Sequence, residues 1–215
     1  MAELDTPYGP ARVAVDTPTR RSGAVSLLVL GHGAGGGVDA PDLIAVTEAA
    51  LRAGVVVARV TQPHRVAGRR APAPAAQLDA AWRAVVTGLC ADPALAGLPL
   101  IVGGRSTGAR VACRTAGSLR AAGIVALAFP LHPPGRPERS RAAELAAVDV
   151  PTLVVNGDRD PFGVPRAGGQ VELCVRPGER HDLRRDPHAV GVAVVTWLGR
   201  HGWADPAVPG GDRTT

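Results

Sequence analysis

The sequence contains no lysine, so arginine supplies every one of its 24 basic side chains. Aromatic residues are also scarce, at 3% of the 215 residues. A protein that binds nucleic acid needs clustered basic side chains or aromatic rings on which bases stack. The arginines here are spread from Arg12 to Arg213, so the net charge of +5 does not form such a cluster. We therefore predict no nucleic-acid partner.

Cysteine is rare, with three residues at positions 90, 113 and 174. An odd number of widely separated cysteines argues against a disulfide framework or a zinc cluster. Apolar stretches such as Val25–Leu30 are far too short to cross a bilayer, and residues 1–10 lack the cationic lead and apolar stretch of a signal peptide. These absences predict a cytoplasmic protein that has no contact with a membrane.

Short β-branched stretches alternate along the chain with longer alanine-rich stretches of helical period. This alternation is typical of βα units that build a mostly parallel sheet with helices on both faces. With 46% apolar residues the chain is large enough for a sizeable core. We predict one α/β domain over residues 1–203, without a substantial cap domain, and a frayed polar tail over residues 204–215.

The predicted elements follow the apolar periodicity and the breaker residues between them. The predicted strands are Ala11–Val15, Val25–Leu30, Val55–Val60, Leu98–Val102, Ile124–Phe129, Thr152–Val155 and Val171–Val175. The predicted helices are Pro41–Arg52, Ala75–Leu89, Thr107–Ala121, Arg139–Ala146 and Pro187–Arg200.

One predicted strand leads into the sequence Gly104-Arg105-Ser106-Thr107-Gly108, which is followed by a predicted helix. The Gly-x-Ser-x-Gly pattern in this context is typical of a nucleophile elbow, a sharp turn that lifts the serine hydroxyl above the sheet. The flanking glycines leave room for the neighbouring strand and helix. The alternative is a glycine-rich helix start that a serine caps. The context favours Ser106 as a nucleophile.

A serine nucleophile needs a histidine base and an acid that orients the base, and α/β hydrolases present them in the chain order serine, acid, histidine. Asp160 follows the predicted strand Thr152–Val155, and His181 follows the predicted strand Val171–Val175. Parallel strands bring the loops at their carboxyl ends together. Asp158 is the alternative acid, because an aspartate in a turn often bonds to its own backbone.

Strand Val25–Leu30 ends in Gly31-His32-Gly33-Ala34-Gly35-Gly36-Gly37, a loop of the kind that supplies a backbone donor to an oxyanion hole. The expected donors are the main-chain N–H groups of Ala34 and Thr107. The same letters also satisfy the Gly-x-Gly-x-x-Gly pattern of a dinucleotide site. The next predicted strand carries no carboxylate that could bind a ribose hydroxyl. It does carry Arg59, so the dinucleotide alternative stays open only for a cofactor with a 2′-phosphate.

A resemblance to a known family rests on the Gly31–Gly35 loop, on Gly103-Gly104-Arg105-Ser106, and on Arg159-Asp160-Pro161-Phe162-Gly163 followed by His181. The chain resembles the small cap-less α/β hydrolases grouped with testis-expressed protein thirty and the third subunit of the NSL chromatin complex, and more distantly dienelactone hydrolase. The resemblance implies the α/β-hydrolase fold and a triad on the same three residues. That grouping includes proteins better known as subunits of complexes than as enzymes.

Together these features predict a serine hydrolase that cleaves a small carboxylic ester or thioester through an acyl-enzyme, with no metal or organic cofactor. Two other classes stay open, a catalytically idle hydrolase fold that serves as a binding module and, with less support, a dinucleotide-binding oxidoreductase. The sequence does not indicate the oligomeric state.

Arginine precedes each residue of the predicted triad, at positions 105, 159 and 180. Arginines that face the cleft would favour an anionic ester. The alternative, which we prefer, is that they form ion pairs with Asp158, Glu179 or Asp182. Arg105, Arg159 and His32, which lies in the glycine-rich loop, are the candidate substrate-binding residues.

Overall fold

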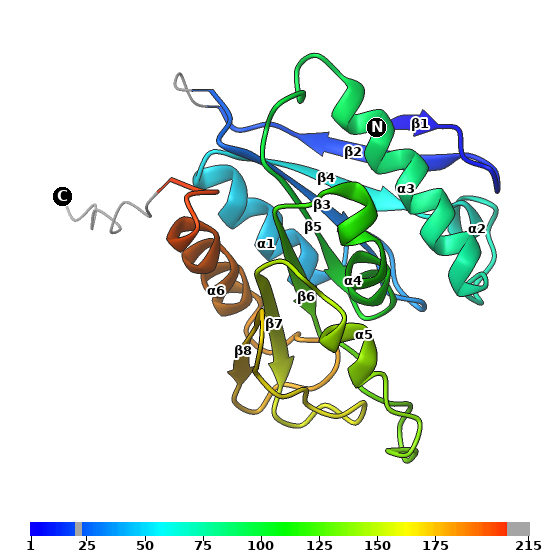
Figure 1. Ribbon diagram of the computed structural model, residues 1–215, viewed down its shortest axis with the longest axis vertical. Helices are drawn as coiled ribbons and strands as arrows, with labels where there is room; N and C mark the ends of the chain where they lie inside the picture. Colours follow the sequence, from blue (N-terminus) through cyan, green and yellow to red (C-terminus); the bar gives the residue numbers. More distant parts are fainter. Residues whose placement is uncertain (20–22, 206–215) are drawn as a thin grey trace.

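The computed structural model describes residues 1–19 and 23–205, and they contain one eight-stranded sheet (Figure 1). The strand order is β1-β2-β4-β3-β5-β6-β7-β8. Strands β3 to β8 are parallel, whereas β1 and β2 join one edge in antiparallel pairings. The strands are β1 (Ala2–Leu4), β2 (Ala11–Asp16), β3 (Ser26–Gly31), β4 (Val55–Thr61), β5 (Leu100–Arg105), β6 (Gly123–Leu127), β7 (Thr152–Gly157) and β8 (Val171–Arg176).

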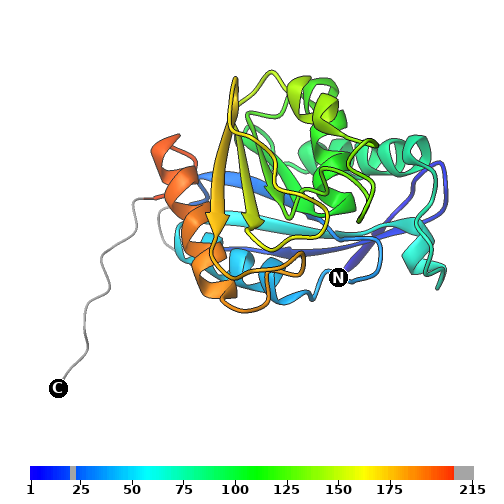
Figure 2. The same cartoon turned by 90° about the horizontal axis from the view of Figure 1, so that it is seen from below.

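Helices cover both faces of the sheet. Helices α1 and α6 lie together on one face, and α3 and α4 cover the other (Figures 1 and 2). The helices are α1 (Pro41–Arg52), α2 (Pro63–Val66), α3 (Ala75–Ala91), α4 (Thr107–Leu119), α5 (Ala142–Ala146) and α6 (Pro187–Arg200). This arrangement confirms the predicted fold class, a mostly parallel sheet between two helical layers.

The central strands are buried on both faces. Every residue of β3, β6 and β7 is buried. In β3 the side chains alternate between the two cores, because Leu27 and Val29 pack with the α3 and α4 side while Leu28 and Leu30 pack with the α1 and α6 side. Continuous apolar runs of this kind are what a parallel strand covered by helices requires.

All the predicted strands and helices are present, with ends displaced by up to three residues. The largest displacement in a strand concerns β5, which was predicted to end at Val102 and instead continues to Arg105. Glycines at positions 103 and 104 suggest a turn, but Gly104 pairs with Gly31 of β3 and Arg105 pairs with Leu127 of β6. Ladder hydrogen bonds on both sides therefore extend the strand to the residue before Ser106.

Two elements were not predicted, β1 and α2. They are three and four residues long, too short for a hydrophobic period to be visible. Helix α2 nevertheless matters for the site, because it buries His64 beneath the loop that follows β3.

The chain beyond α6 remains packed for a few residues. Ala204 is buried in the core on the α1 side, and the Asp205 N–H donates to the Ala53 carbonyl at 2.9 Å. The predicted frayed tail starts at residue 204, and its residues 206–215 lie outside the described residues. Among residues 1–19 and 23–205, no helix combines the length and apolar character needed to span a membrane.

Candidate functional site

The three residues predicted to form a triad lie at the same edge of the sheet. Ser106 follows β5, Asp160 lies three residues after β7, and His181 lies five residues after β8. Because these strands are parallel, their carboxyl ends meet at one edge, and residues far apart in the sequence become neighbours there.

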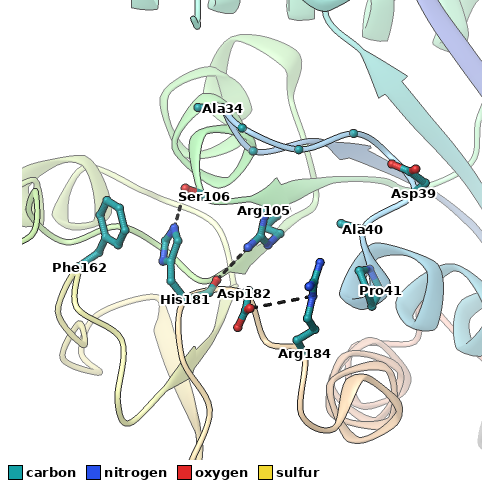
Figure 3. Close-up of a pocket in the computed structure, with 14 residues that line it drawn as sticks. Ala34, Asp39, Ala40, Pro41, Arg105, Ser106, Phe162, His181, Asp182 and Arg184 are labelled. Atoms are coloured by element: carbon teal, nitrogen blue, oxygen red, sulfur yellow. Dashed lines mark hydrogen bonds and ion pairs between the residues drawn. The ribbon is translucent and has the colours of Figure 1, made fainter. Parts of the chain in front are cut away.

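His181 contacts both of its expected partners (Figure 3). Its Nε2 lies 2.9 Å from the Ser106 hydroxyl, and its Nδ1 lies 2.8 Å from Oδ2 of Asp160. An ionised carboxylate only accepts, so a neutral His181 donates from Nδ1 to Asp160 and accepts the Ser106 hydroxyl proton at Nε2. The Phe162 ring stacks on the imidazole with ring centroids 4.0 Å apart. The geometry is that of a serine oriented toward a base.

The Asp160 carboxylate is fully buried and well supplied with donors. Oδ1 accepts the Phe162 N–H at 2.8 Å, and Oδ2 accepts the Asn156 side-chain amide at 3.1 Å in addition to His181. Asp158, the alternative acid, is exposed and accepts the Gly178 N–H at 2.7 Å. Asp158 therefore joins two turns, and Asp160 is the acid that contacts the imidazole.

Ser106 has a strained backbone, with φ 52° and ψ −108°. A residue other than glycine in such a region costs about 1 to 3 kcal/mol, which the surrounding structure must supply. The Ser106 N–H donates to the Leu127 carbonyl of β6 at 2.9 Å, and α4 begins at the next residue. At Gly104 φ is +152°, and a Cβ there would lie 2.3 Å from the Gly31 carbonyl oxygen. The sharp strand-to-helix turn predicted from the Gly-x-Ser-x-Gly pattern is present.

The two predicted oxyanion donors flank this turn. Thr107 is the first residue of α4, so its N–H has no intrahelical acceptor. Ala34 belongs to the glycine loop, by which we mean residues Gly33–Gly37, and lies near Ser106 at the cleft (Figure 3). The positive end of the α4 dipole adds to the field at the serine.

His32 was predicted to contact substrate, and the structure places it elsewhere. The ring is 3% exposed and lies behind the glycine loop. Its Nε2 accepts the Gln62 N–H at 3.1 Å, so Nδ1 carries the proton and donates to the Gly33 carbonyl at 2.8 Å. Burial lowers the pKa of His32 and favours this neutral form. His32 therefore holds the glycine loop against the end of β4 and does not line the cleft.

His64 gives the fold a pH dependence. Burial, together with nearby positive charge, lowers the pKa of this 6% exposed side chain from 6.5 to about 4. The unfolded chain therefore binds a proton between these pH values that the folded chain does not bind. The contribution of His64 to stability is full above pH 6.5 and is lost as the pH falls toward 4.

We expect the free energy of unfolding of the wild type to fall by about 1 to 2 kcal/mol more than that of a His64→Gln variant between pH 7 and pH 4.5. Urea unfolding at several pH values measures this difference, and the comparison cancels other titrating groups. A His188→Gln variant is the control, because His188 is exposed. Parallel pH curves for the wild type and His64→Gln would contradict the expectation.

The arginines that precede the triad residues have different environments. Arg159, one of the candidate substrate-binding residues, and Arg180 are exposed, and neither of them lines the cleft. Arg105 does line the cleft, but its ion-pair partner is Asp42 of α1, not one of the three acids that the sequence suggested. Exposed loop residues such as Arg159 turn toward solvent, where a guanidinium is best hydrated.

The cleft above Ser106 has a volume of about 510 Å³ and is open to solvent. Only α5 and loops lie between β6 and β7. This agrees with the prediction of a domain without a substantial cap. Asp39, Asp182 and Arg184 also line the cleft, although they lie outside the motifs from which the site was predicted. The lining residues are Gly33, Ala34, Gly35, Gly36, Gly37, Asp39, Ala40, Pro41, Arg105, Ser106, Phe162, His181, Asp182 and Arg184.

Two observations argue against the dinucleotide-binding alternative. A pyrophosphate site needs a helix that begins directly at the glycine-rich turn, and α1 begins only at Pro41. Arg59, which would have to bind a 2′-phosphate, lies 3.0 Å from the Asp16 carboxylate and also donates to the Val38 carbonyl.

Comparison with known proteins agrees with this geometry. Residues 24–183, which include Ser106, Asp160 and His181, match the family described as an alpha/beta hydrolase domain. Comparison with curated proteins gives no match.

Among solved structures, a serine hydrolase without a lid from Xanthomonas campestris is 25% identical, with a TM-score of 0.74 over 97% of this chain and 95% of that chain. Est1E from Butyrivibrio proteoclasticus is 17% identical, with a TM-score of 0.76 over 93% and 97%. A dienelactone hydrolase from Anabaena variabilis is 18% identical, with a TM-score of 0.73 over 93% and 95%.

Proposed function

The chain belongs to the alpha/beta hydrolase domain family and is an esterase-like hydrolase, and we propose that Ser106, His181 and Asp160 form its catalytic triad. One observation carries the proposal. Two consecutive hydrogen bonds link the Ser106 hydroxyl through His181 to a buried carboxylate, and the serine faces an open cleft. This order of nucleophile, base and acid is what acyl transfer by serine requires.

The first half of the reaction forms the acyl-enzyme. The Ser106 oxygen attacks the carbonyl carbon of an ester while Nε2 of His181 takes the hydroxyl proton. The N–H groups of Ala34 and Thr107 stabilise the negative charge that develops on the carbonyl oxygen. When the carbon–oxygen bond to the alcohol breaks, His181 returns the proton to the leaving oxygen. Asp160 stays ionised throughout and stabilises the imidazolium.

The second half of the reaction repeats these steps with water. His181 takes a proton from the water, the resulting oxygen attacks the acyl carbon, and the proton then returns to the Ser106 oxygen as the acid leaves. No step needs a metal ion or an organic cofactor. The open cleft suits small or exposed acyl groups, as carboxylic esters or thioesters, better than long lipid chains.

Three finer features remain predictions. They are the closer resemblance to testis-expressed protein thirty and the NSL subunit, the cytoplasmic location, and the domain boundary at residue 203. Each of them is independent of the triad.

A fluorophosphonate probe tests the proposal directly, because it reacts only with an activated serine. We expect one adduct per wild-type chain, located at Ser106 by mass spectrometry of its peptides, and no adduct in a Ser106→Ala variant. Ser118→Ala is the matched control, since the hydroxyl of this α4 serine donates to the Thr115 carbonyl and its loss should not affect labelling. A folded wild-type protein that is not labelled would favour the idle binding module instead.

A further inference from the structure

Arg105 lies against three of the segments that contribute to the site, the His181 loop, the start of α1 and the glycine loop. It is the last residue of β5 and directly precedes Ser106, and its side chain is 15% exposed. Figure 3 shows its guanidinium group beside the His181 carbonyl, between the serine turn and the start of α1. One side chain is thus placed to fix several loops relative to the nucleophile.

Each nitrogen of the guanidinium group faces a different segment. Nη2 donates to the main-chain carbonyl of His181 at 3.2 Å. Nε lies 3.1 Å from Oδ2 of Asp42, in the first turn of α1. Nη1 lies beneath the glycine loop, where a Cβ added to Gly33 would be 3.3 Å away from it and one added to Gly36 would be 3.7 Å away.

Asp42 has no access to solvent, and burial raises its pKa to about 6 although the Arg105 charge opposes that rise. The Arg105 guanidinium is the cation that pairs with the buried Asp42 carboxylate, and main-chain N–H groups of Asp42 and Leu43 also lower the pKa of that carboxyl. Burying a carboxylate costs free energy, and removing Asp42 or Arg105 would leave the other residue as an uncompensated charge. At neutral pH the pair is charged, and it holds the guanidinium at a fixed distance from α1.

We propose that Arg105 is a positioning residue that fixes the His181 loop and the glycine loop relative to Ser106, and that Asp42 holds Arg105 in place. The proposal rests on the function proposed above. Arg105 acts through the His181 backbone, whose displacement would move the imidazole away from the serine. A misplacement of about 1 Å at reacting groups can cost on the order of 100-fold in rate.

The competing role for Arg105 is binding of a carboxylate on the substrate. Two of its three nitrogens already have protein partners, and the negative charges of Asp42, Asp39 and Asp182 lie at or near the cleft. The two roles differ in kinetics, because a substrate contact changes KM for anionic esters alone, whereas positioning changes kcat for all esters.

The test compares Arg105→Lys, Arg105→Met and Asp42→Asn with the wild type on a neutral ester and on its carboxylate-bearing analogue. Lysine keeps the charge next to Asp42, so this variant should fold, but one ammonium group cannot reach both Asp42 and the His181 carbonyl. We expect kcat to fall roughly 10- to 100-fold in all three variants on both esters, with KM changed less than about 3-fold. Arg114→Met is the control, since Arg114 is similarly buried and pairs with Asp79 away from the cleft.

Unchanged kcat in Arg105→Lys, or a rise in KM confined to the anionic ester, would overturn the proposal. So would an equal loss of kcat in Arg114→Met, which would indicate a general effect on the fold. The proton resonance of His181 Nδ1–H supplies a readout that needs no substrate, and we expect it to shift or broaden in Arg105→Lys. If the wild type neither labels nor turns over, the proposed function fails, and this resonance then decides about Arg105: a change supports positioning, and an unchanged resonance contradicts it.

Discussion

An Asp160→Asn variant is expected to hydrolyse esters about 10⁴-fold more slowly than the wild type, with little change in KM. The asparagine amide would donate to Nδ1 of His181, which forces the proton onto Nε2. Nε2 could then no longer accept the Ser106 proton. The magnitude is the loss seen for the corresponding change in a serine protease triad. Steady-state kinetics on a chromogenic ester measures it.

The fold should tolerate this change, because the side-chain oxygen of asparagine can still accept the Phe162 N–H that Oδ1 of Asp160 accepts. The Asn156 amide loses Oδ2 as an acceptor but keeps the Gly163 carbonyl. Asp158→Asn is the matched control. Its carboxylate is exposed and bonds to the Gly178 N–H, so we expect its kcat to remain within about 2-fold of the wild type. A large loss of kcat in Asp158→Asn together with a small loss in Asp160→Asn would identify Asp158 as the acid instead.

The triad candidates could be identified from the sequence because each follows a strand of the parallel part of the sheet. In a parallel sheet the carboxyl ends of all strands share an edge, so Ser106, Asp160 and His181 had to lie near one another once their strands were recognised. The choice between Asp158 and Asp160 was less certain. The turn after β7 directs one carboxylate to Gly178 and the other to His181, and only coordinates distinguish the two.

The contacts around Arg105 could not be predicted, because they depend on strand order. Strand β3 lies next to β5 in the sheet although β4 comes between them in the chain. This exchange brings the start of α1 beside the end of β5 and places Asp42 against Arg105. No periodicity or motif links these two residues.

His32 illustrates a different limit. Its position in a glycine-rich loop indicates a place near the substrate, but the side chain turns inward because two backbone groups, of Gln62 and Gly33, satisfy both of its ring nitrogens. Sequence patterns locate a loop at the site, whereas the direction of this side chain depends on partners such as Gln62, which lies between β4 and α2. The loop is consequently held from behind by His32 and from below by Arg105.

The close approach of α4 to the end of β3 leads to the second large effect. A Cβ on Gly108 would lie 2.4 Å from the Gly31 carbonyl oxygen and 3.0 Å from the His32 carbonyl oxygen, and both are backbone atoms that cannot rotate away. We therefore expect Gly108→Ala to lower the free energy of unfolding by about 3 kcal/mol. Separation of the serine turn from the glycine loop should also lower kcat in the molecules that remain folded.

Gly117 of the same helix offers a matched comparison. It is exposed, and a Cβ there would meet only the Asp149 carboxylate oxygen at 4.0 Å. Alanine is favoured over glycine in a helix interior by up to about 1 kcal/mol, so Gly117→Ala should stabilise the protein slightly. In urea unfolding, the same glycine-to-alanine change should therefore lower the free energy of unfolding at position 108 and raise it at position 117. Equal stability of Gly108→Ala and the wild type would mean that α4 can move away from β3 at little cost, and the tight elbow would then not be what holds Ser106 in its strained conformation.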